Sequence, residues 1–342
     1  MSTTYVICPA GLVTGGPELL HQLVATLHAY NRRAYIVYIP FSEHVETPSA
    51  YAKYDVPVAR REEISEGDIV VLPEVYANKA DDFHKNRVFL WWLSVDNFRL
   101  GLGSARLARY IPASLHPLSR RIARRMALPR TVVRWAGRRG GINTLATVSL
   151  HLHQSEFARQ YLVAEGLGPT APLGDYINDD YLELIANPPT IVRENLMTFN
   201  PLKGAERTAA IVAELQKRGI DFTPVPISGY TRQGVRDLLS RAKLYVDFGN
   251  HPGKDRIPRE AAAMGACVVV NRRGSAGNDI DVPLPDAYKV ADEVEGFAGE
   301  AADKIAAVFA DFDYHTRHFD SYRAGIAREH DEFVRQALSL FP

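Results

Sequence analysis

The sequence predicts an α/β protein with two Rossmann-like domains, each built on a doubly wound parallel sheet. Three observations support this fold class. The chain has 342 residues, which suits two domains of about 150 residues better than one core. Short apolar runs alternate with helical patterns, as expected for strands buried on both faces of a parallel sheet. The same alternation starts again near residue 188, so the second half repeats the organisation of the first.

Four strands and two helices are expected in the first half. Apolar runs rich in β-branched and aromatic residues, which are typical of buried strands, span 5–8, 35–39, 69–72 and 88–92. Leucines recur at helical spacing from Leu19 to Leu27, which predicts a helix over 17–30. A shorter helix is expected over 77–84.

The second half shows the same order of elements. Strand patterns span 191–199, 222–227, 244–248 and 267–270. Helical patterns lie between or after them, over 205–218, 232–242, 257–264, 292–310 and 315–340. A helix cannot run through Pro188 and Pro189, which therefore mark the linker. We expect an N-terminal domain over 1–187, a second domain over 188–314, and a C-terminal helix over 315–342 that packs back on the N-terminal domain.

Composition favours a cytoplasmic protein. Cys8 and Cys267 are the only cysteines, and each lies in an apolar strand-like run, as buried thiols of a reducing compartment do. The N-terminus leads into a strand pattern without the features of a signal peptide. No run approaches the ~20 apolar residues that a membrane span requires, so any membrane contact is expected to be peripheral.

The first candidate ligand-binding motif is Gly15-Gly16-Pro17-Glu18, directly after the first strand. Glycines allow a close approach of the backbone to a ligand, and a helix beginning here offers N–H groups to a diphosphate or a sugar hydroxyl. A plain strand-to-helix turn would have the same sequence. Glu18 would repel a phosphate beside it, so it fits the helix dipole or an acceptor hydroxyl better.

Two further motifs follow strands of the second half. Phe199-Asn200-Pro201-Leu202-Lys203-Gly204 closes the strand over 191–199. The run from Asp247 to Gly265 holds Glu260, followed by three alanines, Met264 and Gly265, before the next strand.

These motifs, in this order, resemble those of glycosyltransferase family 4 and related polysaccharide-cluster transferases. The resemblance implies the GT-B fold, in which two Rossmann-like domains face each other across a cleft. It also implies that Lys203 contacts the donor diphosphate and that Glu260 binds the ribose of the nucleotide. Two positions depart from the family pattern: Thr198 replaces an arginine, and Pro252 replaces the first glutamate of the E-x7-E signature.

Lys254 and Arg256 precede the helix that carries Glu260, where they could supply the phosphate-binding cations that Thr198 cannot. The alternative is a surface ion pair without a role in function, either Asp255 with Arg256 or Arg259 with Glu260. In the family, the loop matching 271–279 lies near the donor sugar, so Ser275 and Asn278 are candidate contacts for ligand hydroxyls. A polar surface loop would look the same.

The strand over 88–92 is followed by Ser94-Val95-Asp96-Asn97, at a carboxyl end where an active-site loop is expected. Asp96 is the candidate catalytic or acceptor-orienting carboxylate, although an aspartate here also suits a helix cap. His151 and His153 alternate on one face of a strand pattern, where metal binding, catalysis and burial are all open, with packing favoured.

The segment 97–142 has no acidic residue but eleven arginines. Within it, Leu118, Ile122 and Met126 recur at helical spacing, and the basic residues between them are Arg120, Arg121, Arg124 and Arg125. This pattern indicates a basic amphipathic helix that contacts an anionic membrane or the acceptor. A solvated or oligomer-forming helix is the alternative; nucleic-acid binding is not expected, because no recognition fold accompanies the charge.

The expected activity is transfer of a sugar, a hexose or deoxyhexose, from a nucleotide-diphosphate sugar to a glycan or lipid-linked acceptor, as in bacterial polysaccharide or cell-envelope glycan synthesis. The donor is a substrate; no cofactor and no metal are expected. The resemblance suggests retention at the anomeric carbon. A non-catalytic protein that binds nucleotide sugars or glycans, and a nucleotide-sugar epimerase or hydrolase, remain alternatives on the same fold.

Overall fold

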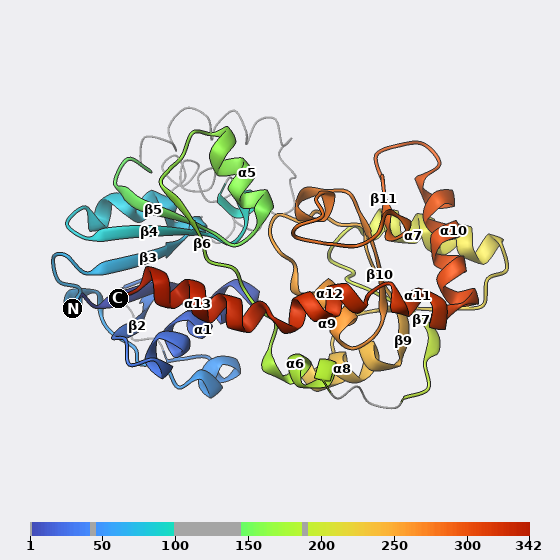
Figure 1. Cartoon of the computed structure of the whole chain (residues 1–342), viewed down its shortest axis with the longest axis horizontal. Coiled ribbons are helices and arrows are strands. Elements are labelled where there is room, and N and C mark those ends of the chain that lie inside the picture. The colour runs from blue at the N-terminus through green and yellow to red at the C-terminus, as the bar shows by residue number, and fades with distance from the viewer. Residues whose placement is uncertain (1, 42–45, 99–144, 187–190) are drawn as a thin grey trace, which may run out of the picture. The chain divides into compact units, whose positions relative to one another are not determined.

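The computed structural model describes residues 2–41, 46–98, 145–186 and 191–342. In this part of the chain, two α/β domains each contain a parallel sheet (Figure 1). By contacts, the chain divides into an N-terminal unit, Met1–Gly174 with Phe333–Pro342, and a C-terminal unit, Asp175–Glu332. Each unit has its own hydrophobic core.

The described part of the N-terminal unit contains a six-stranded sheet in the order β2-β1-β3-β4-β5-β6. Its strands are β1 (Thr4–Pro9), β2 (Ala34–Ile39), β3 (Ile69–Pro73), β4 (Arg87–Trp92), β5 (Val148–His153) and β6 (Thr170–Pro172). Its helices are α1 (Gly15–Ala29), the 3-10 helices η1 (Ser49–Tyr54), η2 (Arg61–Glu63) and η3 (Glu74–Phe83), and α5 (Glu156–Ala164). Strands β1, β3 and β4 are almost wholly buried, which explains why each contains an unbroken run of apolar residues.

The described part of the C-terminal unit contains a five-stranded sheet in the order β11-β10-β9-β7-β8. Its strands are β7 (Glu194–Phe199), β8 (Thr223–Pro226), β9 (Ala242–Asp247), β10 (Cys267–Asn271) and β11 (Lys289–Val290). Its helices are α6 (Asp179–Ala186), α7 (Ala205–Lys217), α8 (Arg232–Arg241), α9 (Arg256–Ala263), η6 (Gly274–Gly277), η7 (Asp286–Tyr288), α10 (Phe297–Ala310), α11 (Phe312–Arg317) and α12 (Asp320–Ala327).

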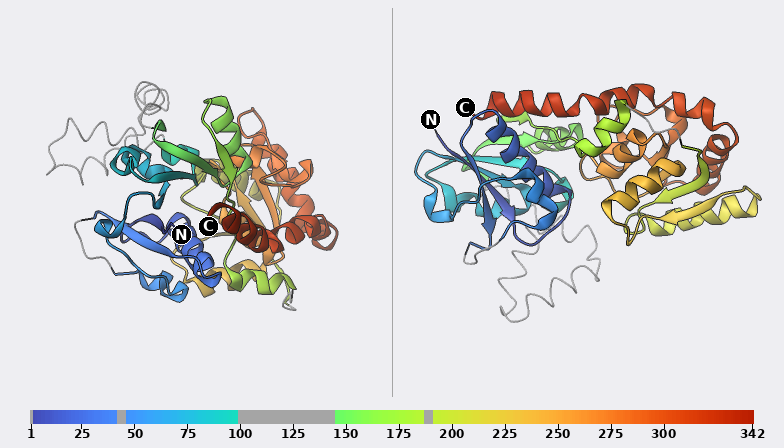
Figure 2. Two further views of the ribbon diagram at one scale, coloured as in Figure 1. Left: turned by 60° about the vertical axis from the view of Figure 1, so that its left-hand side comes forward. Right: turned by 90° about the horizontal axis from the view of Figure 1, so that it is seen from below.

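The last helix, α13 (Glu329–Leu340), begins in the C-terminal unit and ends in the N-terminal one (red in Figure 2). Phe333 stacks on Trp91 of β4, and Phe341, which follows the helix, packs on Phe89 of the same strand. Both phenylalanines are fully buried. The final ten residues therefore complete the core of the N-terminal unit.

The division of the chain lies before the predicted boundary at 187/188. Ile177 and Tyr181 belong to the core of the C-terminal unit, so the segment after Gly174 already packs there. Similarly, only the end of the predicted 315–342 segment joins the N-terminal unit. Phe319 and Ile326 are buried in the core of the C-terminal unit.

Several element boundaries differ from the expected ones for local reasons. The helix expected over 292–310 begins at Phe297, because Gly296 takes a left-handed conformation with φ of 83°. The helix expected over 77–84 is the 3-10 helix η3, which starts at Glu74. The helical pattern over 315–340 is divided among α11, α12 and α13. Its apolar residues therefore pack into the cores of both units.

Candidate functional site

Three loops of the C-terminal unit interlock at the carboxyl edge of its sheet. They follow β7, β9 and β10, and two glycines permit their close approach. A Cβ on Gly204 would lie 2.3 Å from the carbonyl oxygen of Phe248, and one on Gly274 would lie 1.9 Å from that of His251. Both glycines have positive φ, 62° and 55°. The two glycines thus allow the loop after β9 to pack closely against the loops after β7 and β10.

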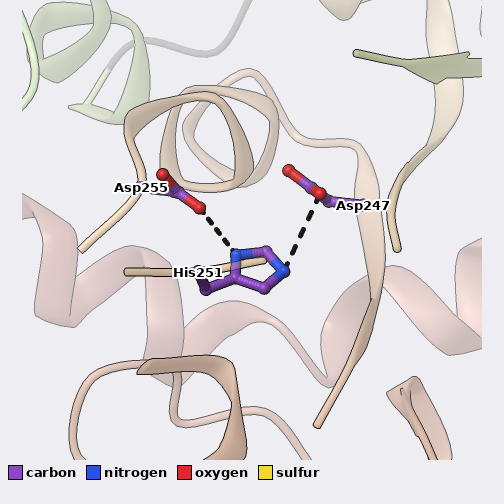
Figure 3. A group of neighbouring side chains, drawn as sticks. All are labelled: Asp247, His251 and Asp255. Carbon is purple, nitrogen blue, oxygen red and sulfur yellow. Dashed lines mark hydrogen bonds and ion pairs between the residues drawn. The ribbon is translucent and has the colours of Figure 1, made fainter. Parts of the chain in front are cut away.

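A chain of charged side chains crosses this edge, as Figure 3 shows for its central part. Asp247, at the end of β9, accepts hydrogen bonds from the Tyr245 hydroxyl and the Gly249 amide, each at 3.0 Å. The ring of His251 lies between two carboxylates, with Nδ1 2.7 Å from Asp255 Oδ2 and Nε2 3.8 Å from Asp247 Oδ1. Lys203 Nζ bonds the other oxygen of Asp255 at 2.7 Å.

The opposite charges of these neighbouring side chains stabilise one another. Burial lowers the pKa of His251, but its hydrogen bond with Asp255 and the charges of Asp247 and Asp255 outweigh that effect and raise the pKa above its ordinary value. Burial raises the pKa of Asp255, yet His251 and Lys203 lower it below its ordinary value overall. Asp255 thus lies between Lys203 and His251, and His251 carries a positive charge between the two carboxylates when it is protonated.

Asp247, His251 and Asp255 offer ligand-type atoms within 4.8 Å of one another. The imidazole ring separates the two carboxylates, however, so each ring nitrogen faces only one of them. Within the described residues, His251 Nε2 is buried without a hydrogen-bond partner and faces Asp247. The three side chains therefore form a compact polar cluster with the imidazole ring between two carboxylates.

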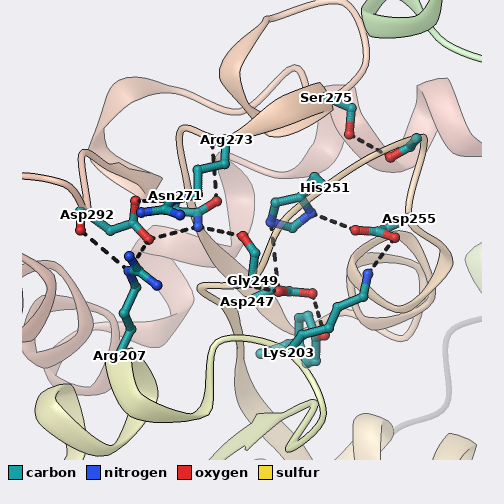
Figure 4. A network of polar contacts seen from close by, with 12 residues as sticks. Lys203, Arg207, Asp247, Gly249, His251, Asp255, Asn271, Arg273, Ser275 and Asp292 are labelled. Atoms are coloured by element: carbon teal, nitrogen blue, oxygen red, sulfur yellow. Dashed lines mark hydrogen bonds and ion pairs between the residues drawn. The ribbon is translucent and has the colours of Figure 1, made fainter. Parts of the chain in front are cut away.

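A second polar group beside the first holds the loops in place (Figure 4). Asp292, just after β11, is buried and pairs with Arg207 and Arg273, with Nε to carboxylate distances of 2.8 Å in both pairs. Asn271 donates to Asp292 at 3.0 Å and to the Gly249 carbonyl at 2.6 Å. The buried carboxylate therefore connects the loops after β9, β10 and β11 to α7.

Ser275 and Asn278 hydrogen bond within the protein. Ser275 is fully buried, and its Oγ donates to the Gly253 carbonyl at 2.7 Å. Asn278 donates to Asp281 at 2.8 Å, and its own side-chain oxygen accepts from two amides of the same turn. Both side chains thus shape the loop after β10.

Lys254 and Arg256 pair with carboxylates from the two ends of the C-terminal unit. Lys254 Nζ pairs with Glu329 Oε1 at 2.5 Å, and Arg256 Nε lies 3.8 Å from Asp175 Oδ2. Both cations therefore have carboxylate partners outside their own loop, and one of these partners, Asp175, is buried.

Arg259, one turn further along α9, is the organising residue of this loop and is only 1% exposed. It donates from Nη1 to Glu329 at 2.7 Å and from Nη2 to Asp175 Oδ2 at 2.8 Å. Asp175 Oδ1 is equally near Nη2 but lies outside hydrogen-bond geometry. Arg259 also donates to the carbonyls of Lys254 and Asp255, at 3.0 and 3.1 Å. Its side chain therefore fixes the backbone that carries Asp255.

Glu260 lies in α9, within the helix predicted over 257–264. It is partly buried, and its charge, after burial, contributes to the raised pKa of Tyr181 on α6. Gly15 and Gly16 belong to the first turn of α1, which begins two residues before the start predicted at Pro17. Glu18 is buried and accepts a hydrogen bond from the Tyr54 hydroxyl at 2.9 Å, which engages it within the N-terminal unit.

In the N-terminal unit, Glu74 at the end of β3 holds the turn that carries Asp96. Its carboxylate accepts from the Leu93 amide at 3.0 Å, and the Ser94 amide and Asn97 side chain also bond to it. Burial raises the pKa of Glu74 to about 7, although these hydrogen bonds oppose the shift. Asp96 is partly exposed in this turn. His151 is buried and accepts from Trp92 Nε1 at 3.1 Å, so packing accounts for its position.

The raised pKa of Glu74 predicts a stability that falls with pH. In the unfolded chain Glu74 loses its proton near the ordinary glutamate pKa of 4.5, whereas in the folded protein it keeps the proton to about pH 7, so the folded state binds more protons between these values. We expect the N-terminal unit to lose about 2 kcal/mol of unfolding free energy between about pH 5 and pH 7.5, and Glu74→Gln to remove this slope. Denaturant titrations followed by tryptophan fluorescence measure it. Glu62→Gln, at an exposed position, is the control; an equal slope in wild type and Glu74→Gln would contradict the assignment.

Six residues were given no role in the site from the sequence: Glu74, Arg207, His251, Asp255, Arg259 and Asp292. A partial signal existed for Glu74, because it follows the strand predicted over 69–72 at its carboxyl end. Arg120, Arg121, Arg124 and Arg125, with the rest of the basic segment up to residue 142, lie outside the described residues. Among the helices that the structure describes, none has the length and apolar character needed to cross a bilayer.

Neither a protein-family model nor a curated protein matches the sequence. Solved structures resemble it in fold. Sucrose-phosphate synthase of Thermosynechococcus elongatus is 12% identical, with a TM-score of 0.64 over 100% of this chain and 98% of that one. A glycosyltransferase of Rickettsia africae is 13% identical, with a TM-score of 0.60 over 99% and 97%. HepE of Anabaena, in complex with UDP-glucose, is 14% identical, with a TM-score of 0.57 over 99% of each chain. Since these similarities include both parallel-sheet domains, the chain has the GT-B fold that its sequence predicted.

Proposed function

We propose that the chain is a glycosyltransferase that takes a sugar from a nucleotide-diphosphate donor held by the C-terminal unit. The observation that carries the proposal is the position of Lys203. It stands at the carboxyl edge of the sheet, just before α7, where its ammonium pairs with the carboxylate of Asp255. A donor diphosphate is an anion that competes for such an ammonium, and the ammonium then stabilises the charge on the leaving group.

The other donor contacts follow the same edge. Glu260 is proposed to accept hydrogen bonds from ribose hydroxyls, and the loop with Ser275 and Asn278 to lie beside the donor sugar. Gly15 and Gly16 are proposed to let the start of α1 approach the ligand closely. UDP-glucose in HepE and UDP in a neighbouring α-glucosyltransferase belong to the same ligand class.

On the acceptor side, we propose Asp96 as the group that orients or deprotonates the attacking hydroxyl. The hydroxyl oxygen bonds to the anomeric carbon, the bond from that carbon to the phosphate oxygen breaks, and the nucleoside diphosphate leaves with the electron pair. The proton of the hydroxyl goes to the base. A glycan or lipid-linked acceptor, a hexose or deoxyhexose donor sugar, retention of configuration and membership of glycosyltransferase family 4 remain parts of this proposal.

Contact of the segment 97–142 with an anionic membrane is also a proposal. It rests on the arginines of that segment, which the sequence alone supplies. A role in bacterial polysaccharide or cell-envelope synthesis, in the cytoplasm or at the inner face of the plasma membrane, is proposed from the resemblance of the sequence motifs. The transfer is proposed to need no metal and no cofactor.

Binding of nucleotide sugars tests the donor site. Isothermal titration with UDP, GDP, dTDP, CMP and their sugar conjugates should find one nucleotide class that binds. Lys203→Met should weaken that binding about 10- to 100-fold, because a charged hydrogen bond to phosphate is lost. Lys217→Met, at the other end of α7 and 79% exposed at its side chain, is the matched control and should bind like wild type.

Product analysis then identifies the reaction. Transfer requires release of nucleoside diphosphate that depends on an added acceptor. Turnover without acceptor would indicate an epimerase or hydrolase, and binding without turnover a non-catalytic protein. Absence of binding by every nucleotide in the panel would contradict the donor site itself.

A further inference from the structure

The side chain of Asp255 does not cap α9, although Asp255 occupies the N-cap position of that helix. Asp255 is the N-cap residue of α9, where an aspartate usually accepts hydrogen bonds from amides of the first turn. Here its side chain makes no such bond. Oδ1 instead takes the ammonium of Lys203 and Oδ2 the ring of His251, each at 2.7 Å.

These two cations converge on Asp255 from separate loops. Lys203 comes from the loop between β7 and α7, and His251 from the loop between β9 and α9 (Figure 4). Two cations beside the starts of two helices are the features from which proteins build phosphate sites. In this structure a carboxylate of the protein itself fills that position.

The ion pair of Lys203 and Asp255 is partly exposed to solvent, whereas the His251 ring that contacts Asp255 is buried. The side chains of Lys203 and Asp255 are 31% and 21% exposed, so a ligand can reach the ion pair. The His251 side chain is 1% exposed, which places it behind the pair. The backbone of Asp255 is held by Arg259, so the side chain can move while the main chain stays in place.

The charged and titratable groups around His251 come from three elements. β9 supplies Asp247, with the Tyr245 hydroxyl behind it; the segment before α9 supplies Asp255; and the loop before α7 supplies Lys203. The start of η6 contributes the neutral amide of Ser275, which donates to the His251 carbonyl at 2.8 Å.

We infer that Asp255 is an internal competitor of the donor diphosphate, which holds Lys203 until the donor displaces it, and that His251 retains the displaced carboxylate. This inference rests on the proposed function and adds a regulatory contact to it. The diphosphate takes the Lys203 ammonium. Asp255 keeps its bond to His251.

Protonation of His251 makes the exchange easier. The imidazolium neutralises Asp255, so Lys203 is held less strongly, and its positive charge also attracts the incoming diphosphate. When His251 is neutral, Asp255 depends on Lys203 for its counter-charge. Donor affinity should therefore rise as the pH falls.

Asp255→Asn tests the competition directly. Asparagine can still cap α9 but no longer holds the ammonium, so we expect UDP-glucose, or another nucleotide sugar that binds, to bind about 10-fold more tightly at pH 8. Asp286→Asn, at an exposed surface pair with Arg272, changes the net charge equally and should leave the affinity unchanged. An unchanged or weaker affinity in Asp255→Asn would overturn the inference.

The pH profile tests the part played by His251. A nucleotide sugar is the appropriate probe, because its doubly esterified diphosphate does not titrate near neutral pH. Wild type should bind it roughly 3- to 10-fold more tightly at pH 6 than at pH 8, and His251→Gln should show weak binding at both. A His251→Gln variant with the wild-type slope would overturn this role.

Binding of inorganic pyrophosphate, measured at one pH, shows whether a negative result contradicts this inference or the proposed function. Tighter pyrophosphate binding by Asp255→Asn without any nucleotide-sugar binding would support the competition and contradict the transferase. Nucleotide-sugar binding that Asp255→Asn does not strengthen would contradict the competition alone. No binding of either ligand by either protein would contradict both.

Discussion

Arg259→Met is expected to lower the unfolding free energy of the C-terminal unit by roughly 3 to 5 kcal/mol, because it leaves buried carboxylates without their main counter-charge. Burial opposes the charge on Arg259, but Asp175 and Glu329 outweigh it and raise its pKa further. The substitution also removes the two hydrogen bonds that fix the backbone of the loop before α9. Lysine lacks the planar guanidinium group with its several N–H donors, so Arg259→Lys should lower the unfolding free energy nearly as much.

The two units can be followed separately during denaturation. The three tryptophans, Trp91, Trp92 and Trp135, all precede Gly174, so fluorescence reports on the N-terminal unit and far-UV circular dichroism on both. Arg241→Met, at the exposed pair with Glu194, is the matched control and should change little. A loss in Arg259→Met no greater than that of Arg241→Met would show that solvent or Lys254 compensates the carboxylates.

Gly274→Ala is expected to cost roughly 3 to 5 kcal/mol of the same unit's stability. The new Cβ would meet the His251 carbonyl at 1.9 Å, and that oxygen belongs to a backbone held by the Ser275 amide. Relief requires movement of one loop, in addition to the strain of a left-handed alanine. The displaced segment carries His251, so nucleotide-sugar binding should weaken too.

Gly296→Ala isolates the steric part of this prediction. Gly296 also has a positive φ, 83°, but a Cβ there would have no atom within 4 Å. Its substitution should cost only about 1 kcal/mol, from backbone strain. Equal losses in the two variants, by circular dichroism in denaturant, would contradict the close contact between the loops.

The sequence was most informative where local pattern decides structure. Buried parallel strands need apolar residues on both faces, so β1, β3, β4 and β10 could be predicted from short runs. Strand β11 has only two residues, Lys289 and Val290, and leaves no such pattern. The N-terminal unit also takes Phe333 and Phe341 from the far end of the chain, and a local apolar pattern does not show which strand such residues will cover.

The candidate site was predictable in its types of residue but not in their pairing. Lys203, Lys254 and Arg256 were all expected to be phosphate-binding cations. Lys203 pairs with Asp255 at the carboxyl edge of the sheet, whereas Lys254 pairs with Glu329, far along the chain. A charged side chain near a helix start has many possible partners, and folding alone determines which carboxylate it meets.

The return of residues 333–342 to the N-terminal unit has a consequence for biosynthesis. The ribosome makes the chain from its N-terminus, so Phe333 and Phe341 emerge only after the entire C-terminal unit. Until then, Phe89 and Trp91 lack the aromatic rings that cover them in the finished protein. The first unit to be translated is thus the last to be completed, and its exposed aromatic surface on β4 is the part of the nascent chain that a chaperone would need to protect.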